Sequence, residues 1–128
     1  SELLEPIKPL LNAGMIFEAI VLMLNNISAN SVFYKKALKL EGAVTFNQIA
    51  MKCVYEMFMN IINEKSTGKK SKSRWLTPEV ISTYYAQSLC FITEGWIAQG
   101  MDDIEPKEMA EAYMYLITRS MDDILSEL

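Results

Sequence analysis

The stretch from Val80 to Ala98 constrains the fold of this chain more than any other segment, because Glu94 is its only charged residue. Its apolar side chains recur at helical spacing, which predicts a helix over residues 79–99. A helix that is apolar on nearly every side must be covered on nearly every side. The rest of the chain, or a second copy of it, therefore has to surround this helix.

Helical periodicity extends over the remaining sequence, with no sustained strand-like alternation and no Asn-Gly or Asp-Gly hairpin turn. We expect further helices over residues 14–29, 31–40, 46–63 and 106–126, preceded by a short stretch, 2–11, that its prolines interrupt. The 128 residues thus predict one all-α domain, an antiparallel bundle of about five helices. Residues 64–75, rich in Gly, Ser, Lys and Arg, are predicted to form a flexible basic loop.

Several residues carry signals for helix ends. Thr77 before Pro78 is a good N-cap followed by a proline at the first helical position. Thr45 followed by Gln48 fits a capping box. Gly42 and Gly100 stand just past the expected ends of two helices, where a left-handed residue is favoured.

Composition excludes several classes of function. The chain has no His, which removes Ser-His-Asp and Cys-His catalysis and the common zinc sites. Cys53 and Cys90 lie in apolar segments without a CxxC pattern, as expected of reduced, buried thiols. The net charge of −4 suits DNA phosphates poorly, so this domain should not bind nucleic acid by itself. We expect no enzyme activity, no cofactor, no metal and no membrane segment, in a cytoplasmic protein.

The last two predicted helices carry more apolar surface than a five-helix chain is expected to cover. Two copies of this hairpin would bury it in an intermolecular four-helix bundle, in preference to a monomer with a thick core. The predicted dimer interface consists of one stripe from each helix: Tyr85, Leu89, Ile92, Trp96, Tyr113, Leu116, Ile117, Ser120 and Ile124.

A small-molecule site, if the bundle holds one, is expected between the helix at 46–63 and the inward face of the helix at 79–99. Its candidate residues combine apolar walls with a few hydrogen-bonding groups: Phe46, Ile49, Cys53, Met57, Tyr84, Ser88 and Phe91. The same stripes are also what simple core packing produces. Glu94 either faces a cationic ligand, pairs across a dimer or lies at a solvated edge, and burial statistics favour the edge.

Two blocks of sequence resemble the C-terminal domain of TetR-family transcriptional regulators of the Firmicutes type. The first block is Leu24-x-x-Ile27-x-x-Asn30-x-x-Phe33-Tyr34-Lys35-Lys36-Ala37-Leu38, followed by Glu41-Gly42 and Phe46. The second is Tyr85-Ala86, Trp96-Ile97-x-x-Gly100-Met101 and Pro106-x-Glu108-Met109-Ala110. Ser88 stands where this family often has Gly.

The resemblance implies a bacterial regulator that dimerises through its last two helices and binds a small-molecule effector inside the bundle. Effector binding then changes the spacing of two DNA-reading heads, and operator DNA is contacted only through an N-terminal helix-turn-helix that would precede Ser1. Residues 1–12 then correspond to the remnant of a connecting helix. The identity of the effector does not follow from the resemblance.

Two other classes of function compete with a sensor. A stand-alone helical interaction module would have a tightly packed bundle without an internal cavity and an exposed apolar groove instead. An enzyme would need convergent catalytic groups. The pairs Asp102-Asp103 and Asp122-Asp123 are instead spaced like surface charge.

Overall fold

The computed structural model describes residues 5–40, 42–65 and 72–128, and all regular structure within them is helical. This confirms the all-α prediction. A single 3-10 turn, Glu5–Ile7, is followed by seven α-helices: α1 Lys8–Asn12, α2 Ile16–Ala29, α3 Ser31–Leu40, α4 Gly42–Lys65, α5 Pro78–Ala98, α6 Pro106–Thr118 and α7 Met121–Glu127.

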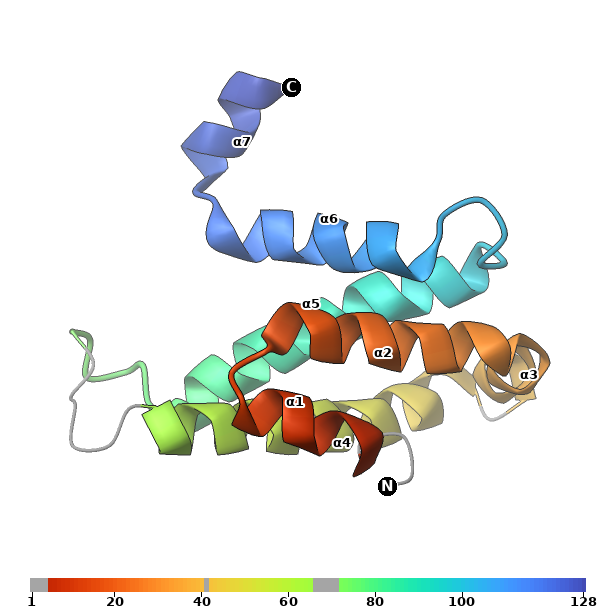
Figure 1. Ribbon diagram of the computed structural model, residues 1–128, viewed down its shortest axis with the longest axis horizontal. Helices are drawn as coiled ribbons and strands as arrows, with labels where there is room; N and C mark the ends of the chain where they lie inside the picture. Colours follow the sequence, from red (N-terminus) through yellow and green to blue (C-terminus); the bar gives the residue numbers. More distant parts are fainter. Residues whose placement is uncertain (1–4, 41, 66–71) are drawn as a thin grey trace.

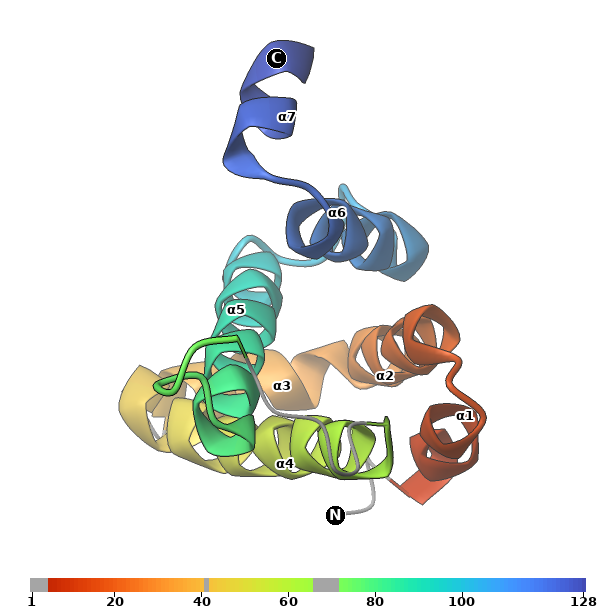
Figure 2. The same ribbon diagram turned by 90° about the vertical axis from the view of Figure 1, so that its left-hand side faces the viewer.

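The helices pack as a bundle from which the last one projects. α4 lies along α5, α2 lies along α6, and α1 contacts both α2 and α4 (Figure 1). α3 turns away from α2 by 82° and contacts α4 and α5 at one end of the bundle. α7 stands apart from the other helices in both views (Figures 1 and 2). Within the described residues no single helix has the length and apolar character needed to cross a membrane, although α2 and α3 meet that requirement as two bent pieces.

One continuous core joins the helices. Its members are apolar side chains of α1, α2, α4, α5 and α6 at helical spacing, including Leu24, Phe58, Leu89 and Ile97. Two buried polar groups are satisfied within it. The Trp96 indole Nε1 donates to the carbonyl of Ile104 at 2.8 Å, and the Tyr113 hydroxyl donates to the carbonyl of Tyr85 at 3.1 Å. These bonds tie α5 to the turn that follows it and to α6.

The start and stop signals of α5 act as predicted. The Thr77 hydroxyl accepts a hydrogen bond from the amide of Val80 at 3.2 Å, and Pro78 is the first helical residue. At the other end Gly100 has φ +100°. The amides of Gly100 and Met101 bond back to the carbonyls of Ile97 and Trp96, which is a Schellman motif.

α4 begins earlier than predicted. Gly42 is its first residue rather than the left-handed residue that ends α3, and Thr45 lies within the helix. The capping box expected at Thr45 and Gln48 therefore does not mark a helix start, and the Thr45 side chain lies outside the described part of the chain. α4 also continues to Lys65, into the predicted basic loop, of which residues 66–71 lie outside the described residues.

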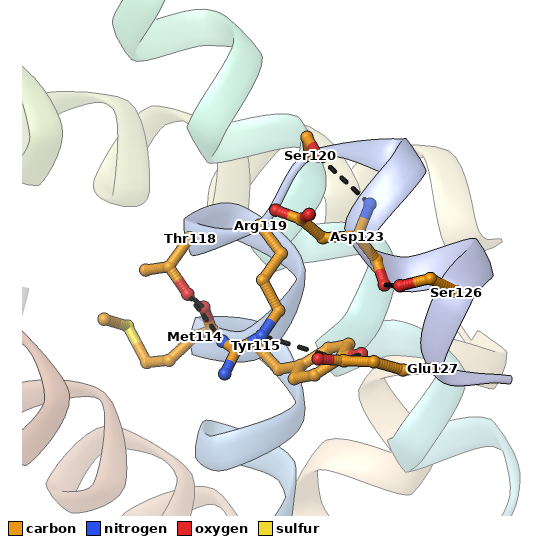
Figure 3. Close-up of polar contacts among 8 residues, drawn as sticks. All are labelled: Met114, Tyr115, Thr118, Arg119, Ser120, Asp123, Ser126 and Glu127. Carbon is orange, nitrogen blue, oxygen red and sulfur yellow. Dashed lines mark hydrogen bonds and ion pairs between the residues drawn. The ribbon is translucent and has the colours of Figure 1, made fainter.

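The predicted helix over 106–126 is two helices. α6 ends at Thr118, and Arg119 is extended, with φ −121° and ψ 149°. The Ser120 hydroxyl accepts from the amide of Asp123 at 3.1 Å and caps a new helix, α7 (Figure 3). Serine followed by acidic residues in the first turn is a strong start signal, and it outweighs the apolar periodicity that runs through it.

Side chains hold this corner between α6 and α7 together. Arg119 lies over the Tyr115 ring, 4.3 Å from its centroid, and its Nε is 3.9 Å from Glu127 Oε2. The Tyr115 hydroxyl donates to the same Glu127 carboxylate (Figure 3). These side chains link the end of α7 to α6, while none of the residues of α7 is buried.

Candidate functional site

A cavity of about 290 Å³ lies between α2, α3, α4 and α5. Its volume is at the small end of the range for small-molecule sites. The walls are mainly aliphatic and aromatic: Met23, Ile27, Phe33, Tyr34, Ala37, Phe46, Ile49, Ala50, Cys53, Val54, Leu89, Cys90, Thr93 and Glu94. Tyr34 and Phe46 form an edge-to-face pair across α3 and α4, with ring centroids 6.4 Å apart.

α4 brings part of the predicted ligand site to this cavity. Phe46, Ile49 and Cys53 recur every three or four residues and all line the cavity wall. Met57, one turn further along, is buried in the core and does not line the cavity. The α4 stripe therefore points into the cavity at one end and into packed core at the other.

α5 presents a different face to the cavity from the one predicted. Tyr84 and Phe91 lie outside it and are 67 % and 76 % exposed. Ser88 turns toward α6, where its Oγ is 2.9 Å from the Tyr113 hydroxyl. Because α5 is apolar nearly all round, its periodicity does not tell which stripe meets α4.

The residues of α5 that do line the cavity are Leu89, Cys90, Thr93 and Glu94. Of these, Leu89 was predicted to lie in a dimer interface, and Cys90 and Thr93 had no predicted role in binding. One signal was present: Thr93 and Glu94 form a polar pair within an otherwise apolar helix. The residues contributed by α2 and α3 had no comparable signal.

Two polar side chains of α5 set the chemistry of the cavity. Glu94 Oε2 accepts a hydrogen bond from the Asn47 side-chain amide of α4 at 2.9 Å. The neighbouring Thr93 is 8 % exposed, and its Oγ1 has no hydrogen-bond partner in the described structure. An unpaired buried hydroxyl is costly to the folded protein.

The thiol of Cys90 is not activated. Burial, together with smaller contributions from the Glu94 carboxylate and the Cys53 thiol, raises the pKa of Cys90 to about 12. A thiol with such a pKa stays protonated near neutral pH and is a poor nucleophile. Burial likewise raises the pKa of the Tyr34 phenol. Neither the Cys90 thiol nor the Tyr34 phenol is therefore activated for reaction near neutral pH.

The predicted dimer residues divide into two groups. Leu89, Trp96 and Tyr113 are buried in the protomer's own core, each at most 3 % exposed, so in this conformation they have little surface left for a partner. The others retain some surface: Tyr85, Ile92, Leu116, Ile117, Ser120 and Ile124.

Other apolar side chains of the last three helices are well exposed. We call them the outer apolar set: Tyr84 and Phe91 of α5, Leu116 of α6, and Met121 and Leu125 of α7. Of these, only Leu116 was among the predicted interface residues. Aromatic and Met residues of this kind are enriched at protein interfaces.

The described residues contain no group of three or more side chains suited to holding a metal ion. Residues 15–119, which extend from the start of α2 to the end of α6, match a family model described as a transcriptional regulator C-terminal region. No curated protein and no solved structure matches the chain. The matched region contains every residue that lines the cavity.

Proposed function

The chain belongs to the C-terminal regulatory regions of TetR-family transcriptional regulators, a family of regulators and not of enzymes, and from this membership we propose that it senses a small molecule. The effector binds in the cavity between α2, α3, α4 and α5. The observation that carries this proposal is the apolar pocket of about 290 Å³ between four helices, which opens to solvent where Phe33 and Ile49 are 66 % and 65 % exposed. The competing interaction module calls for an exposed apolar groove, and the binding experiment below separates the two.

The second part of the proposal is a homodimer formed through α5, α6 and α7. Members of this family typically dimerise. The outer apolar set supports the same conclusion, since it would otherwise leave large apolar side chains in water. Pairing α5 and α6 with a second copy gives the intermolecular four-helix bundle, and α7 contributes Met121 and Leu125 to its edge.

In the full-length regulator, effector binding changes the spacing of two DNA-binding heads in a cytoplasmic dimer. α5 connects the two events because it lines the cavity on one side and carries Tyr84 and Phe91 on the other. A ligand shifts such an equilibrium only by binding one conformation more tightly than the other. Two-fold symmetry then calls for a roughly palindromic operator.

The cavity is tested with N-phenylnaphthylamine, a neutral dye whose fluorescence rises in apolar surroundings. We expect saturable binding of one dye per protomer to the unmodified protein. The Ala50→Phe variant fills the cavity and should abolish binding, while Ala29→Phe, at an exposed position of α2, should leave it unchanged. Circular dichroism establishes that both variants are folded.

Binding that survives Ala50→Phe would contradict the effector site. If it is lost instead in a Tyr84→Ala variant, the dye occupies the surface hollow of about 710 Å³ formed by Trp75, Leu76, Tyr84 and their neighbours. That result would favour the interaction module. The absence of any binding would remove the cavity as a ligand site.

A further inference from the structure

Among the described residues that line the apolar cavity, Glu94 is the one ionisable carboxylate. Asn47 donates one hydrogen bond to its Oε2, and a carboxylate accepts several. Within the described residues, no Lys or Arg forms an ion pair with it. The wall therefore carries a negative charge that no cation of the described structure balances.

The position of Glu94 explains how an apolar wall tolerates a charge. The residue also lines the shallow hollow on the outer side of α5, together with Phe91, Gly95 and Gln99. It thus lies where the interior cavity meets the solvent-facing side of the helix. A ligand head group at this place keeps part of its hydration while its apolar part lies inside.

Thr93 lies beside the carboxylate on the same wall. Its residue surface is almost fully buried, and its hydroxyl is unpartnered and has almost no accessible surface. The accessible acceptors at this place are therefore those of the Glu94 carboxylate, which can accept from a group that donates several hydrogen bonds.

The remaining walls offer a ligand mainly apolar contact. Phe33, Phe46 and the aliphatic side chains around them have no polar atoms, so apart from the Tyr34 hydroxyl and two thiols a ligand body finds little to hydrogen-bond to. An anionic ligand would meet the Glu94 carboxylate without a compensating cation and would be repelled.

We propose that the effector is a small apolar molecule carrying one protonated amine, with its ammonium group at Glu94 and its hydrocarbon part between Tyr34, Phe46 and Leu89. This assignment rests on the proposed function, because it takes the cavity to be the effector site. Charge-assisted hydrogen bonds contribute about 1.5–3 kcal/mol each, equivalent to a tenfold or larger gain in affinity.

The probes are octylamine, octanol and octanoate, which share one chain and differ in the charge of the head group. Isothermal titration calorimetry near neutral pH and below micelle-forming concentrations measures their affinities. We expect octylamine to bind at least about tenfold more tightly than octanol, and octanoate more weakly than both. Glu94→Gln should remove the preference for the amine and leave octanol binding unchanged.

Two controls separate the cavity from general attraction to an acidic protein. Glu111→Gln removes the same charge from an exposed position of α6 outside the cavity, and it should preserve the preference for octylamine. Ala50→Phe should abolish binding of octylamine and octanol alike. Circular dichroism and the binding of octanol establish that Glu94→Gln retains its fold and its cavity.

The two proposals fail in different ways. Equal affinities for octylamine and octanol, or a preference for the amine that survives Glu94→Gln, would overturn the assignment of the ligand class and leave the cavity proposal intact. Binding of N-phenylnaphthylamine without binding of octylamine would do the same. If neither the dye nor any octyl compound binds, the effector site itself is wrong.

Discussion

The inner and outer faces of α5 have similar apolar composition and opposite surroundings. Leu89, Cys90 and Ile97 on the inner side are covered by the rest of the protomer, whereas Tyr84 and Phe91 on the outer side are mostly exposed. Hydrophobicity alone therefore does not determine burial within one chain. The inner face is covered because α4 runs along it, and the outer face is left for something outside the protomer.

The helices around the cavity and the last helix differ in the same way. The helices that enclose the cavity contain most of the core, whereas α7 has no buried residue. A short helix with exposed Met and Leu side chains gains little from its own protomer. This difference agrees with the two surfaces that we propose: an effector site formed by α2 to α5, and a dimer interface formed by α5 to α7.

The largest expected effect separates two tryptophans. Trp96 is 3 % exposed and hydrogen-bonded to Ile104, whereas Trp75 is 72 % exposed. Replacing Trp96 with Ala should lower the free energy of unfolding by about 3–5 kcal/mol, because it leaves a large cavity in the core. Trp75→Ala should change it by no more than about 0.5 kcal/mol.

Urea unfolding at one fixed protomer concentration measures both values, since association contributes to the stability of a dimer. If Trp96→Ala and Trp75→Ala lowered the free energy of unfolding equally, Trp96 would not be the buried core residue that the structure shows.

A charge on the outer face should break the dimer without unfolding the protomer. Phe91→Asp is expected to raise the dimer dissociation constant about 30-fold or more, which corresponds to roughly 2 kcal/mol, because it removes an aromatic anchor and places a carboxylate in an apolar interface. Val32→Asp is the matched control, because Val32 is also well exposed, at 66 %, but belongs to α3.

Sedimentation equilibrium over a range of concentrations reports both dissociation constants. A protein that is monomeric before any substitution would remove the proposed interface, and an equal effect of both variants would move it away from α5.

The smallest effect distinguishes two glycines of the same segment. Gly100 has φ +100°, so Gly100→Ala should cost about 1–2 kcal/mol through backbone strain. Gly95 is helical, and a Cβ added there meets nothing within 4 Å. Gly95→Ala should therefore stabilise the protomer by up to about 1 kcal/mol.

Thermal and urea unfolding measure the stabilities of the Gly100→Ala and Gly95→Ala variants. Sedimentation equilibrium measures in addition whether Gly95→Ala changes the association of two copies. If Gly95→Ala stabilises the protomer but weakens association, the helices of two copies cross closely at this glycine. Destabilisation of the protomer by both variants would mean that the surroundings of Gly95 are not as open as the geometry indicates.

Local signals were the most reliable part of the sequence analysis. Thr77 and Pro78 mark the start of α5 and Gly100 marks its end, as predicted. Caps and left-handed residues act through a few neighbouring backbone groups, so a short stretch of sequence is enough to reveal them. Ser120, the N-cap of α7, is a signal of the same kind, but the apolar periodicity across it led to the prediction of one continuous helix over 106–126. At Thr45 and Gln48 the reverse happened, since a pattern typical of a cap lies inside a helix.

The candidate site was predicted only in part. Phe46, Ile49 and Cys53 line the cavity, whereas the α5 residues chosen with them lie on other faces of that helix. The rotation of α5 about its axis depends on where α4 and α6 pack against it. The positions of Thr93 and Glu94 on the cavity wall, and the walls formed by α2 and α3, follow from that packing.

By itself, the order of residues determined that the chain is helical and where α5 begins and ends, and it showed that α5 is apolar on nearly every side. Those properties depend on backbone propensity, caps and total hydrophobicity, which are local or additive. Only the tertiary structure decided which stripe of α5 faces the cavity, which aromatic side chains remain outside, and that Glu94 borders an apolar cavity. These depend on the relative rotation of packed helices, and a helix that is apolar all round carries no internal mark of that rotation.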